Sequence, residues 1–593
     1  MMTTLKNKIF TSLVLGLMAF AFSVSANAKT GDRIRYMPIQ DSGRIKPFDT
    51  FAQETLEIIY GKKSYKPEEG AAAIDAHWVV MTWMLSPESW ANRPLFEVKF
   101  HDVLDKLGLS KEKKYFTGEE LFRNEKFANV MQELTNKRET KEKLTPYFQA
   151  LQRLENQFFI FREIASGRML HVMPRKDGPD VKEEDKDKWI AVADLPIDVQ
   201  PAFMEISKNV AQYLGATTDV SALKKEMGET DDGSKKSQIK ENLTKANVTV
   251  EEAGKKLDDS VLAFQKLAGE AAPEKYTYTE KVKTEVLYND VHPFRWAYIF
   301  YLMAALSLLF IWIRRLEKGM AVVWTFMALG FLVHTLGFVF RVYLAERPPV
   351  SNMYETVIWV SWGAVLFSII LELNYRFRLL LLGGSLVGLF ALIIADSAPA
   401  ILDPSIQPLE AVLRSNYWLI VHVMTITISY AAFMLAFGLG DLGLIYSVLG
   451  EEKHKETIQK LTTGVYRAMQ IGVAFLTPGI ILGGIWADYS WGRFWGWDPK
   501  ETWALIVLLG YIVVLHARLV GWLKNFGMLA AGVVTFSLVI MAWYGVNFVL
   551  GAGLHTYGFS AGGVEYVSVF VLLHMVFVAY AYFVQKSQPQ KSN

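Results

Sequence analysis

The chain has 593 residues, of which 51% are hydrophobic, and its formal net charge is +2. A charge this close to zero, together with the lack of a basic stripe or a nucleic-acid motif, argues against a nucleic-acid partner. The sequence contains no cysteine, so this chain forms no disulfide, builds no thiolate metal site and does not act as a thiol reductant.

Hydropathy divides the sequence into two unlike parts. Residues 29–290 are rich in Lys and Glu and contain no long apolar run, whereas residues 296–585 form a series of apolar segments of about twenty residues each. A segment of that length crosses the hydrocarbon core of a membrane as a helix. The pattern predicts an all-α polytopic membrane protein with about nine transmembrane helices, preceded by a mainly α-helical extracytoplasmic N-terminal domain.

Residues 1–28 have the features of a secretory signal peptide. Lysines precede the apolar stretch 9–24, and an Ala-x-Ala cleavage site ends at Ala28. An uncleaved anchor is the alternative, although the apolar run is short for an anchor. Either interpretation puts the residues from Lys29 onward outside the cytoplasm.

Residues 29–290 are predicted to form the extracytoplasmic domain. The expected elements are a turn-rich opening segment at 36–50, amphipathic helices over 50–165, short strands at 168–171 and 189–192, an exposed helical hairpin at 222–268, and a strand or extended linker at 276–288. Three isolated histidines are interpreted as structural or surface residues and not as ligands: His77, His101 and His171.

The second half of the chain contains nine apolar runs, at approximately 296–313, 320–342, 356–373, 378–395, 417–449, 464–486, 500–520, 526–550 and 564–584. Lys and Arg crowd one set of the short loops between these runs and are sparse in the other set, which predicts that the crowded set is cytoplasmic. The N-terminal domain and the loop 488–503 then both lie on the outer, periplasmic side of a bacterial inner membrane. Residues 586–593 become a cytoplasmic tail.

The loop between the sixth and seventh runs holds four tryptophans within thirteen residues: Trp491, Trp495, Trp497 and Trp503. Its second half has the pattern of a helix start, with Asp498 as N-cap, Pro499 in the first helical position and Glu501 three residues after the cap. A belt of interfacial tryptophans is one explanation of the indoles. The glycines between them favour another, in which the rings lie flat against a large aromatic ligand.

This segment resembles the tryptophan-rich WWD signature of the haem-handling family that includes CcsA (also called ResC), CcmF and CcmC. Residues 417–431 begin Tyr-Trp-Leu-Ile-Val-His, end Ser-Tyr-Ala, and resemble the CcsA helix before that signature. Residues 545–558 begin Gly-Val-Asn, include Gly-Leu-His-Thr-Tyr-Gly, and resemble the loop after it. Over residues 292–585 the chain is therefore most similar to CcsA of the system II cytochrome c maturation pathway. The opening segment 36–50 is similar to one found ahead of the CcsA part in extended members.

The resemblance implies a role in cytochrome c maturation. It implies that the protein binds haem b and presents it at an outer WWD/bis-histidine site, where it supports thioether attachment of haem to the Cys-x-x-Cys-His segment of an apocytochrome c. Export of haem across the membrane is a further implication. The implied partners are a ResB-like membrane subunit, apocytochrome c, thiol-reducing thioredoxin-like proteins acting upstream, and membrane lipid. The protein would be a component of a cytochrome c synthetase, and its status as an enzyme stays open because no general acid or base stands out.

The resemblance also assigns the haem site. His422, near the outer end of the fifth run, and His555, in the outer loop after the eighth, match the two external iron ligands of the family. His516 in the seventh run matches a membrane-embedded ligand, and an ionisable residue at such a position is a functional candidate. The implied haem-binding residues are His422, His555, His516, Trp491, Trp495, Trp497, Asp498 and Trp503. His334 is a further haem-binding candidate without a clear match in the family, and a hydrogen-bonded polar residue between helices is at least as good an explanation of it.

Two details of this site stay open in the sequence. Three candidates exist for the second iron ligand beside His516: a residue of a partner chain, His334 of this chain, or His574 of this chain. His334 and His574 lie at different depths in the membrane from His516, which favours the partner residue. Arg341 and Arg347 are candidates to pair with a haem propionate, because a guanidinium matches the geometry of a carboxylate. Helix capping by Ser351 or Asn352 is the plainer explanation for part of that loop.

A transporter or channel with a solute-binding outer domain is the alternative function. It predicts helices broken by Gly or Pro near the middle of the membrane. Pro478 and the Gly438–Gly440 segment are the features that suggest such breaks. A purified protein without Soret absorbance after haem loading would favour this alternative.

Overall fold

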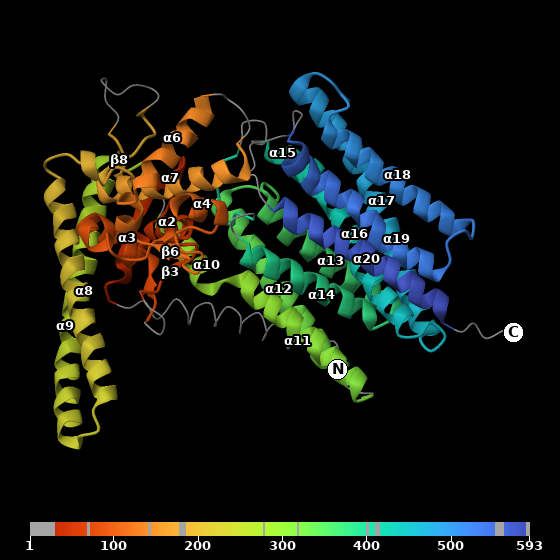
Figure 1. The fold of residues 1–593 in the computed structure, drawn as a ribbon, viewed down its shortest axis with the longest axis horizontal. Coiled ribbons are helices and arrows are strands. Elements are labelled where there is room, and N and C mark those ends of the chain that lie inside the picture. Colours follow the sequence, from red (N-terminus) through yellow and green to blue (C-terminus); the bar gives the residue numbers. More distant parts are fainter. Residues whose placement is uncertain are drawn as a thin grey trace. The chain divides into compact units, whose positions relative to one another are not determined.

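A computed structural model describes residues 30–67, 72–139, 144–176, 185–276, 279–316, 319–398, 402–409, 415–551, 555 and 563–588. The predicted signal peptide and its cleavage site lie outside these residues, as does most of the predicted tail. Contacts divide the chain into two compact units, Met1–Val291 and His292–Asn593. Figure 1 colours the first from red to yellow-green and the second from green to blue.

The N-terminal unit contains small antiparallel sheets among its helices. The largest has the strand order β2-β1-β7-β8, and Ile39 of β1 pairs in it with Lys46 of β2. The strands predicted at 168–171 and 189–192 are present as β7 and β8, with shifted ends. The strands are β1 (Pro38–Asp41), β2 (Arg44–Pro47), β3 (Ser64–Tyr65), β4 (Ile74–Asp75), β5 (Phe96–Glu97), β6 (Tyr115–Phe116), β7 (His171–Met173) and β8 (Ile190–Ala191).

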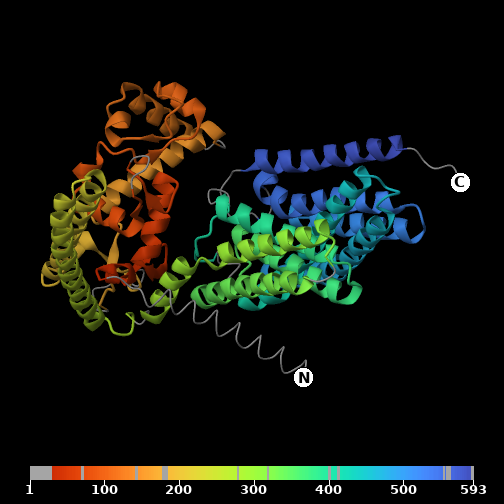
Figure 2. The same cartoon turned by 90° about the horizontal axis from the view of Figure 1, so that it is seen from below.

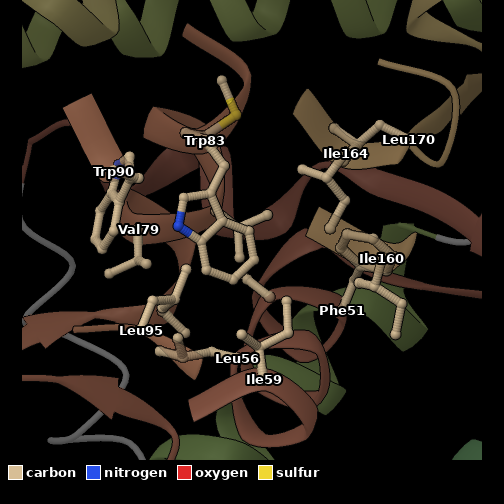
Figure 3. Close-up of a cluster of buried hydrophobic side chains, with 14 of the residues drawn as sticks. Phe51, Leu56, Ile59, Val79, Trp83, Trp90, Leu95, Ile160, Ile164 and Leu170 are labelled. Carbon is tan, nitrogen blue, oxygen red and sulfur yellow. The ribbon is translucent and has the colours of Figure 1, made fainter. Parts of the chain in front are cut away.

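The core of this unit lies where α2, α3 and α7 meet. Apolar residues three and four apart give α2 and α7 one face to bury, whereas α3 is apolar on nearly all sides. Trp83 of α3 is fully buried between these helices. Figure 3 shows Trp83 among side chains of all three helices, including Leu56 and Ile164. The helices are α2 (Phe48–Tyr60), α3 (Ala76–Leu85), α4 (His101–Leu107), α5 (Gly118–Phe122), α6 (Glu125–Glu139), α7 (Pro146–Ala165), α8 (Gln200–Glu229), α9 (Gly233–Ala271) and α10 (Thr279–Val291), with the short 3₁₀ turns η1 (Asp32–Tyr36), η2 (Pro87–Trp90) and η4 (Val192–Asp194).

Two predictions for this unit have different outcomes. The helical hairpin predicted at 222–268 is confirmed and is longer, because it consists of α8 (30 residues) and α9 (39 residues), which lie side by side (Figures 1 and 2). The strand or linker predicted at 276–288 is wrong, since residues 279–288 belong to α10. Its buried positions, Val282, Glu285 and Val286, follow the three- and four-residue spacing of a helix.

The membrane unit is a bundle of long apolar helices. Nine helical segments of the described residues are long and apolar enough to cross a membrane, as predicted. They are Glu280–Ile313, which contains α11 (Pro293–Ile313), then α12 (Met320–Ala345), α13 (Met353–Tyr375), α14 (Leu379–Ser397), η6 with α16 (Leu419–Val448), α17 (Lys455–Trp491), α18 (Pro499–Leu519), α19 with η7 (Asn525–Leu550) and α20 (Val564–Ser587).

α16 lies at the centre of this bundle and packs on α13, α17 and α19. Gly472 of α17 lets Phe433 of α16 approach so closely that a Cβ at 472 would lie 2.2 Å from its ring. In a membrane, apolar side chains gain little from contact with another helix in place of lipid, so helices associate through close van der Waals packing, which small residues allow. Pro478 and the Gly438–Gly440 segment both lie inside continuous helices. The helix breaks that the transporter interpretation predicts at these positions are therefore not present.

Candidate functional site

Two helices of the membrane unit change to π-helical geometry at one end. η6 (Leu419–Val423) leads into α16 and carries His422, and the short α15 (Asn416–Trp418) precedes it. η7 (Met541–Leu550) continues α19 and carries Trp543 and Asn547. A π-helical turn holds one more residue than an α-helical turn, and such turns are frequent at functional sites. Side chains from both π-helical stretches line the same pocket.

The pocket has a volume of about 210 Å³ and is mostly apolar. Its walls come from residues 350–356, from η6 and α16, from the last turns of α17, from the start of α18 and from η7, with His555 added by the loop that follows. Pockets that enclose a drug-sized ligand hold about 300–1,000 Å³. A ligand as large as a porphyrin would therefore fill this pocket and extend beyond its mouth.

His422 is held by the backbone of the neighbouring helix. Its Nδ1 lies 2.9 Å from the carbonyl oxygen of Gly479 in α17. Because a carbonyl only accepts, Nδ1 carries the proton and Nε2 carries the lone pair. The ring packs edge-on to Trp486, with centroids 5.7 Å apart, and covers Gly483, where a Cβ would lie 2.6 Å from Cε1. The imidazole is therefore fixed in orientation as well as in tautomer.

His555 is held by a carboxylate that also caps a helix. Its Nδ1 lies 2.8 Å from Oδ1 of Asp498, and its ring stands edge-on to Trp491 at 5.0 Å. Asp498 is the N-cap of α18, and Glu501 completes a capping box, so the predicted helix start is confirmed. Burial lowers the pKa of His555, and the nearby Asp498 opposes this shift without cancelling it. The imidazole is thus neutral at neutral pH.

The predicted tryptophans divide between three environments. Trp491 and Trp495 line the pocket, Trp497 is 70% exposed, and Trp503 packs against the hydrophobic core of the membrane unit. Two tryptophans that were not predicted, Trp486 and Trp543, also line the pocket. For Trp486 the sequence did contain a signal, because the pocket-lining positions of α17 recur every three or four residues up to the WWD segment.

The other predicted histidines do not line the pocket. His334 is fully buried, and its ring nitrogens lie 3.1 Å from the hydroxyl of Tyr301 and 3.1 Å from the carbonyl oxygen of Ile358. His516 is exposed on α18, and its Nδ1 contacts the carbonyl oxygen of Ile512. His574 contacts Asp441 at 3.4 Å.

Arg341 lies inside the bundle, not at the pocket. Its guanidinium contacts Glu355 at 2.7 Å, and both side chains are 1% exposed. The carboxylate of Glu355 also accepts from Ser351, whereas Asn352 caps α13. These bonds support the plainer explanation of this loop, in which its polar residues order the helix start that forms one pocket wall.

Comparison with known proteins identifies the family. Residues 350–555 match the Cytochrome C assembly protein family. A CcsA cytochrome c biogenesis protein of Parasynechococcus marenigrum is 33% identical over 290 residues, which cover 44% of this chain and 94% of that protein. The chain belongs to the CcsA family. The CcsA of Chlamydomonas reinhardtii is 35% identical over 218 residues, or 36% of this chain and 61% of that protein.

A second kind of relative extends beyond the CcsA part. Protein NrfI of Wolinella succinogenes is 27% identical over 549 residues, which cover 87% of this chain and 53% of NrfI. The chain thus spans about half the length of NrfI. The protein is a multi-span membrane protein of cytochrome c biogenesis. Its match to the Cytochrome C assembly protein family begins at Val350 and ends at His555, two residues that line the pocket.

The chemistry of the pocket fits the haem that CcsA family membership implies. A histidine that ligates iron does so as a neutral imidazole, and its other ring nitrogen is usually fixed by a carbonyl or a carboxylate. His422 and His555 supply one example of each arrangement. The indoles of Trp486, Trp491 and Trp495 supply flat apolar cover beside them.

Proposed function

We propose that this CcsA-family protein binds haem b in the pocket and presents it for covalent attachment to an apocytochrome c. His422 and His555 are the proposed iron ligands. The observation that carries the proposal is that these two histidines, from separate elements, line one pocket with their Nδ1 atoms already hydrogen-bonded. In each ring this leaves Nε2 as the nitrogen with the chemistry of a ligand.

The chain's own contribution is orientation. Gly479 and Asp498 set the tautomers of the two histidines, and the indoles limit the plane in which a flat ligand lies. Haem supplies two vinyl groups, across which the thiols of a reduced Cys-x-x-Cys-His segment add to give thioethers. No thiol of this chain competes with those of the apocytochrome, since the sequence contains no cysteine.

We also propose an inner haem site at His516 that takes its second ligand from a ResB-like membrane partner. His516 is exposed on the surface of the bundle, and α18 and α20 are among the least buried spans. Both ring nitrogens of His334 have contacts within the bundle, which argues against it as an internal ligand. Haem would pass from this site to the outer pocket.

The remaining proposals concern organisation. The boundaries proposed are 29–290 for an extracytoplasmic domain, 291–585 for the haem-handling domain and 586–593 for a cytoplasmic tail. The Lys and Arg distribution supports placing the N-terminal domain and the WWD loop on the outer side. The charged helices of the N-terminal domain suit contact with apocytochrome or partner protein, with thioredoxin-like proteins acting upstream as thiol reductants.

An absorption spectrum of the detergent-purified protein tests the central proposal. Wild-type protein loaded with haem is expected to give the Soret and α/β bands of six-coordinate low-spin haem, and imidazole is expected to restore them in a His555→Ala variant. A His516→Ala background removes any contribution from the inner site. A featureless Soret region in haem-loaded protein of that background would contradict the proposal and favour the transporter.

A further inference from the structure

Lys500 places a positive charge in the wall of the pocket. It is the second residue of α18, and its ammonium reaches across to η7, where Nζ lies 3.0 Å from the carbonyl oxygen of Ala542 and 3.2 Å from that of Trp543. An ammonium group has three N–H donors, so the two carbonyls leave one for another acceptor. Lys500 also lines the pocket, which is where such an acceptor would lie.

The acidic side chains around Lys500 are already engaged. Asp498 accepts from His555 and from the backbone of α18. Glu501 accepts from the backbone N–H groups of Gly496 and Asp498 and pairs with Arg493 at 3.3 Å. Among the described residues, no carboxylate lies within 4.0 Å of Nζ of Lys500. The carbonyls orient the ammonium without neutralising it.

We propose that Lys500 binds an anionic carboxylate of the pocket's ligand, namely a propionate of haem. A cation beside apolar rings is costly to desolvate unless an opposite charge meets it. The pocket therefore has the complement of an amphiphilic ligand: indoles for a planar apolar body and one ammonium for an acidic edge. This inference rests on the proposed function, and it moves the propionate contact from Arg341, which Glu355 already engages.

Esterified haem provides the test. Iron protoporphyrin IX and its dimethyl ester are titrated into the purified full-length chain in detergent, in the His516→Ala background, with Soret absorbance as the readout. A charge-assisted hydrogen bond is worth about 1.5–3 kcal/mol, so the wild-type lysine is expected to favour the acid over the ester about 10- to 150-fold. Lys500→Gln is expected to reduce that ratio to about one.

Two variants at the same site serve as controls. Arg493→Gln removes a cation from the same loop, but one that already pairs with Glu501, and it is expected to leave the ratio of acid to ester unchanged. Lys500→Arg keeps the charge and is expected to keep a preference for the acid. If Lys500 only braces η7, Lys500→Gln would weaken acid and ester equally, and this result would overturn the inference.

The wild-type protein decides the question even where Lys500→Gln fails to fold. Equal affinity for acid and ester, with normal low-spin spectra, would overturn the propionate contact and leave the proposed function intact. No binding of either compound would overturn both. The phosphate of an anionic lipid is the alternative ligand of Lys500. In that case anionic lipid, but not zwitterionic lipid, would compete with haem in the wild-type protein, and acid and ester would bind equally. This result would show that the inference is wrong.

Discussion

The two units use their polar interior in different ways. In the N-terminal unit, Lys46 is 1% exposed and lies between the carboxylates of Asp41 and Glu54. Around the pocket of the membrane unit, His422 and Lys500 contact backbone carbonyls instead. A buried charge that meets an opposite side chain is complete within the protein. After these contacts His422 still has its Nε2 lone pair, and Lys500 still has one N–H donor, for a ligand. This difference leads us to infer stabilisation in the N-terminal unit and ligand binding in the membrane unit.

The N-terminal ion pairs connect the opening segment to α10. Arg44 contacts Glu285 through two bonds of 2.7 and 2.8 Å, and Arg35 contacts both Asp49 and Asp290. The opening segment predicted at 36–50 forms β1, β2 and the start of α2. Burial acts to lower the pKa of Lys46, but its two carboxylate partners outweigh this and raise it, so the lysine stays charged.

The largest expected effect is a loss of cytochrome c maturation, and it distinguishes His422 of the membrane unit from His77 of the N-terminal unit. His422→Ala is expected to abolish cytochrome c maturation, because iron loses an axial nitrogen, and added imidazole is expected to restore part of it. His77 in the N-terminal unit is 3% exposed, and burial lowers its pKa to about 3. His77→Ala is expected to reduce the amount of folded protein but not maturation per molecule, and imidazole should not help it.

The measurement is haem staining of a c-type cytochrome, normalised to membrane-inserted protein. Full maturation by His422→Ala would contradict the ligand assignment. Rescue of His77→Ala by imidazole would contradict the distinction between the two units.

The next effect concerns stability of the N-terminal unit. Arg44→Ala leaves the buried carboxylate of Glu285 without this partner and is expected to cost about 3–5 kcal/mol of unfolding free energy. Arg44→Met combined with Glu285→Leu is expected to recover most of it, because paired apolar replacements of a buried ion pair are often neutral. Hydrogen exchange across α10 provides the measurement. The exposed Lys245, paired with Glu241, is the control whose alanine variant should change nothing measurable.

A smaller effect is expected from the carboxylate behind His555. Asp498→Asn keeps a good N-cap but removes the negative charge that faces Nδ1 of His555. Such changes behind a metal ligand cost about 10- to 100-fold in affinity. The haem dissociation constant measures this, and an unchanged melting temperature shows that the cap survives. Asp488→Asn, at an exposed position near the end of α17, is the matched control. Equal affinities for both variants would contradict a role of Asp498 in ligation.

The pH dependence follows from the lowered pKa of His555. Only the neutral ring binds iron, and protonation competes below the folded-state pKa, which burial lowers from the ordinary value of 6.5. Haem affinity at the outer site is therefore expected to begin to fall at a lower pH than it would for a histidine with the ordinary pKa of 6.5, and to approach a drop of about tenfold per pH unit well below the shifted pKa. Asp498→Asn removes the group that opposes the shift, so the drop should begin at lower pH. A drop already centred at or above the ordinary value would contradict the shift.

The sequence predicted the spans well and the pocket in part. Runs of about twenty apolar residues are a strong signal, and all nine predicted runs have a helix in the described residues. The WWD segment, His422 and His555 line one pocket. They could be predicted from the sequence because each belongs to a motif of the family. The helix α10 was missed because the alternation of Tyr and Thr before it resembles a strand, whereas the contact of Glu285 with Arg44 depends on residues far apart in the chain.

Other parts of the site had no local signal. Trp543 reaches the pocket from a π-helical stretch, which shifts side chains away from the regular helical spacing that sequence analysis uses. Nothing in the sequence distinguishes Lys500 from the other outer-side charges, and only its contacts with Ala542 and Trp543 show that it turns inward. In the reverse direction, Arg341 looked available at the membrane surface, but Glu355 pairs with it inside the bundle.

The smallest expected effect distinguishes two indoles of the WWD segment itself. Trp491 stands edge-on to His555 at 5.0 Å, and an aromatic pair of this kind is worth about 0.5–1.5 kcal/mol. Trp491→Ala is therefore expected to weaken haem binding about 2- to 10-fold. Trp497 is 70% exposed, does not line the pocket and has a left-handed backbone with φ of 56°. Its replacement by glycine, which tolerates that backbone, is expected to leave haem affinity unchanged. Soret titration of the two variants measures both effects. Equal weakening of haem binding by Trp497→Gly and Trp491→Ala would mean that the ligand extends over the exposed part of the loop. The distinction between pocket-lining and exposed indoles would then be wrong.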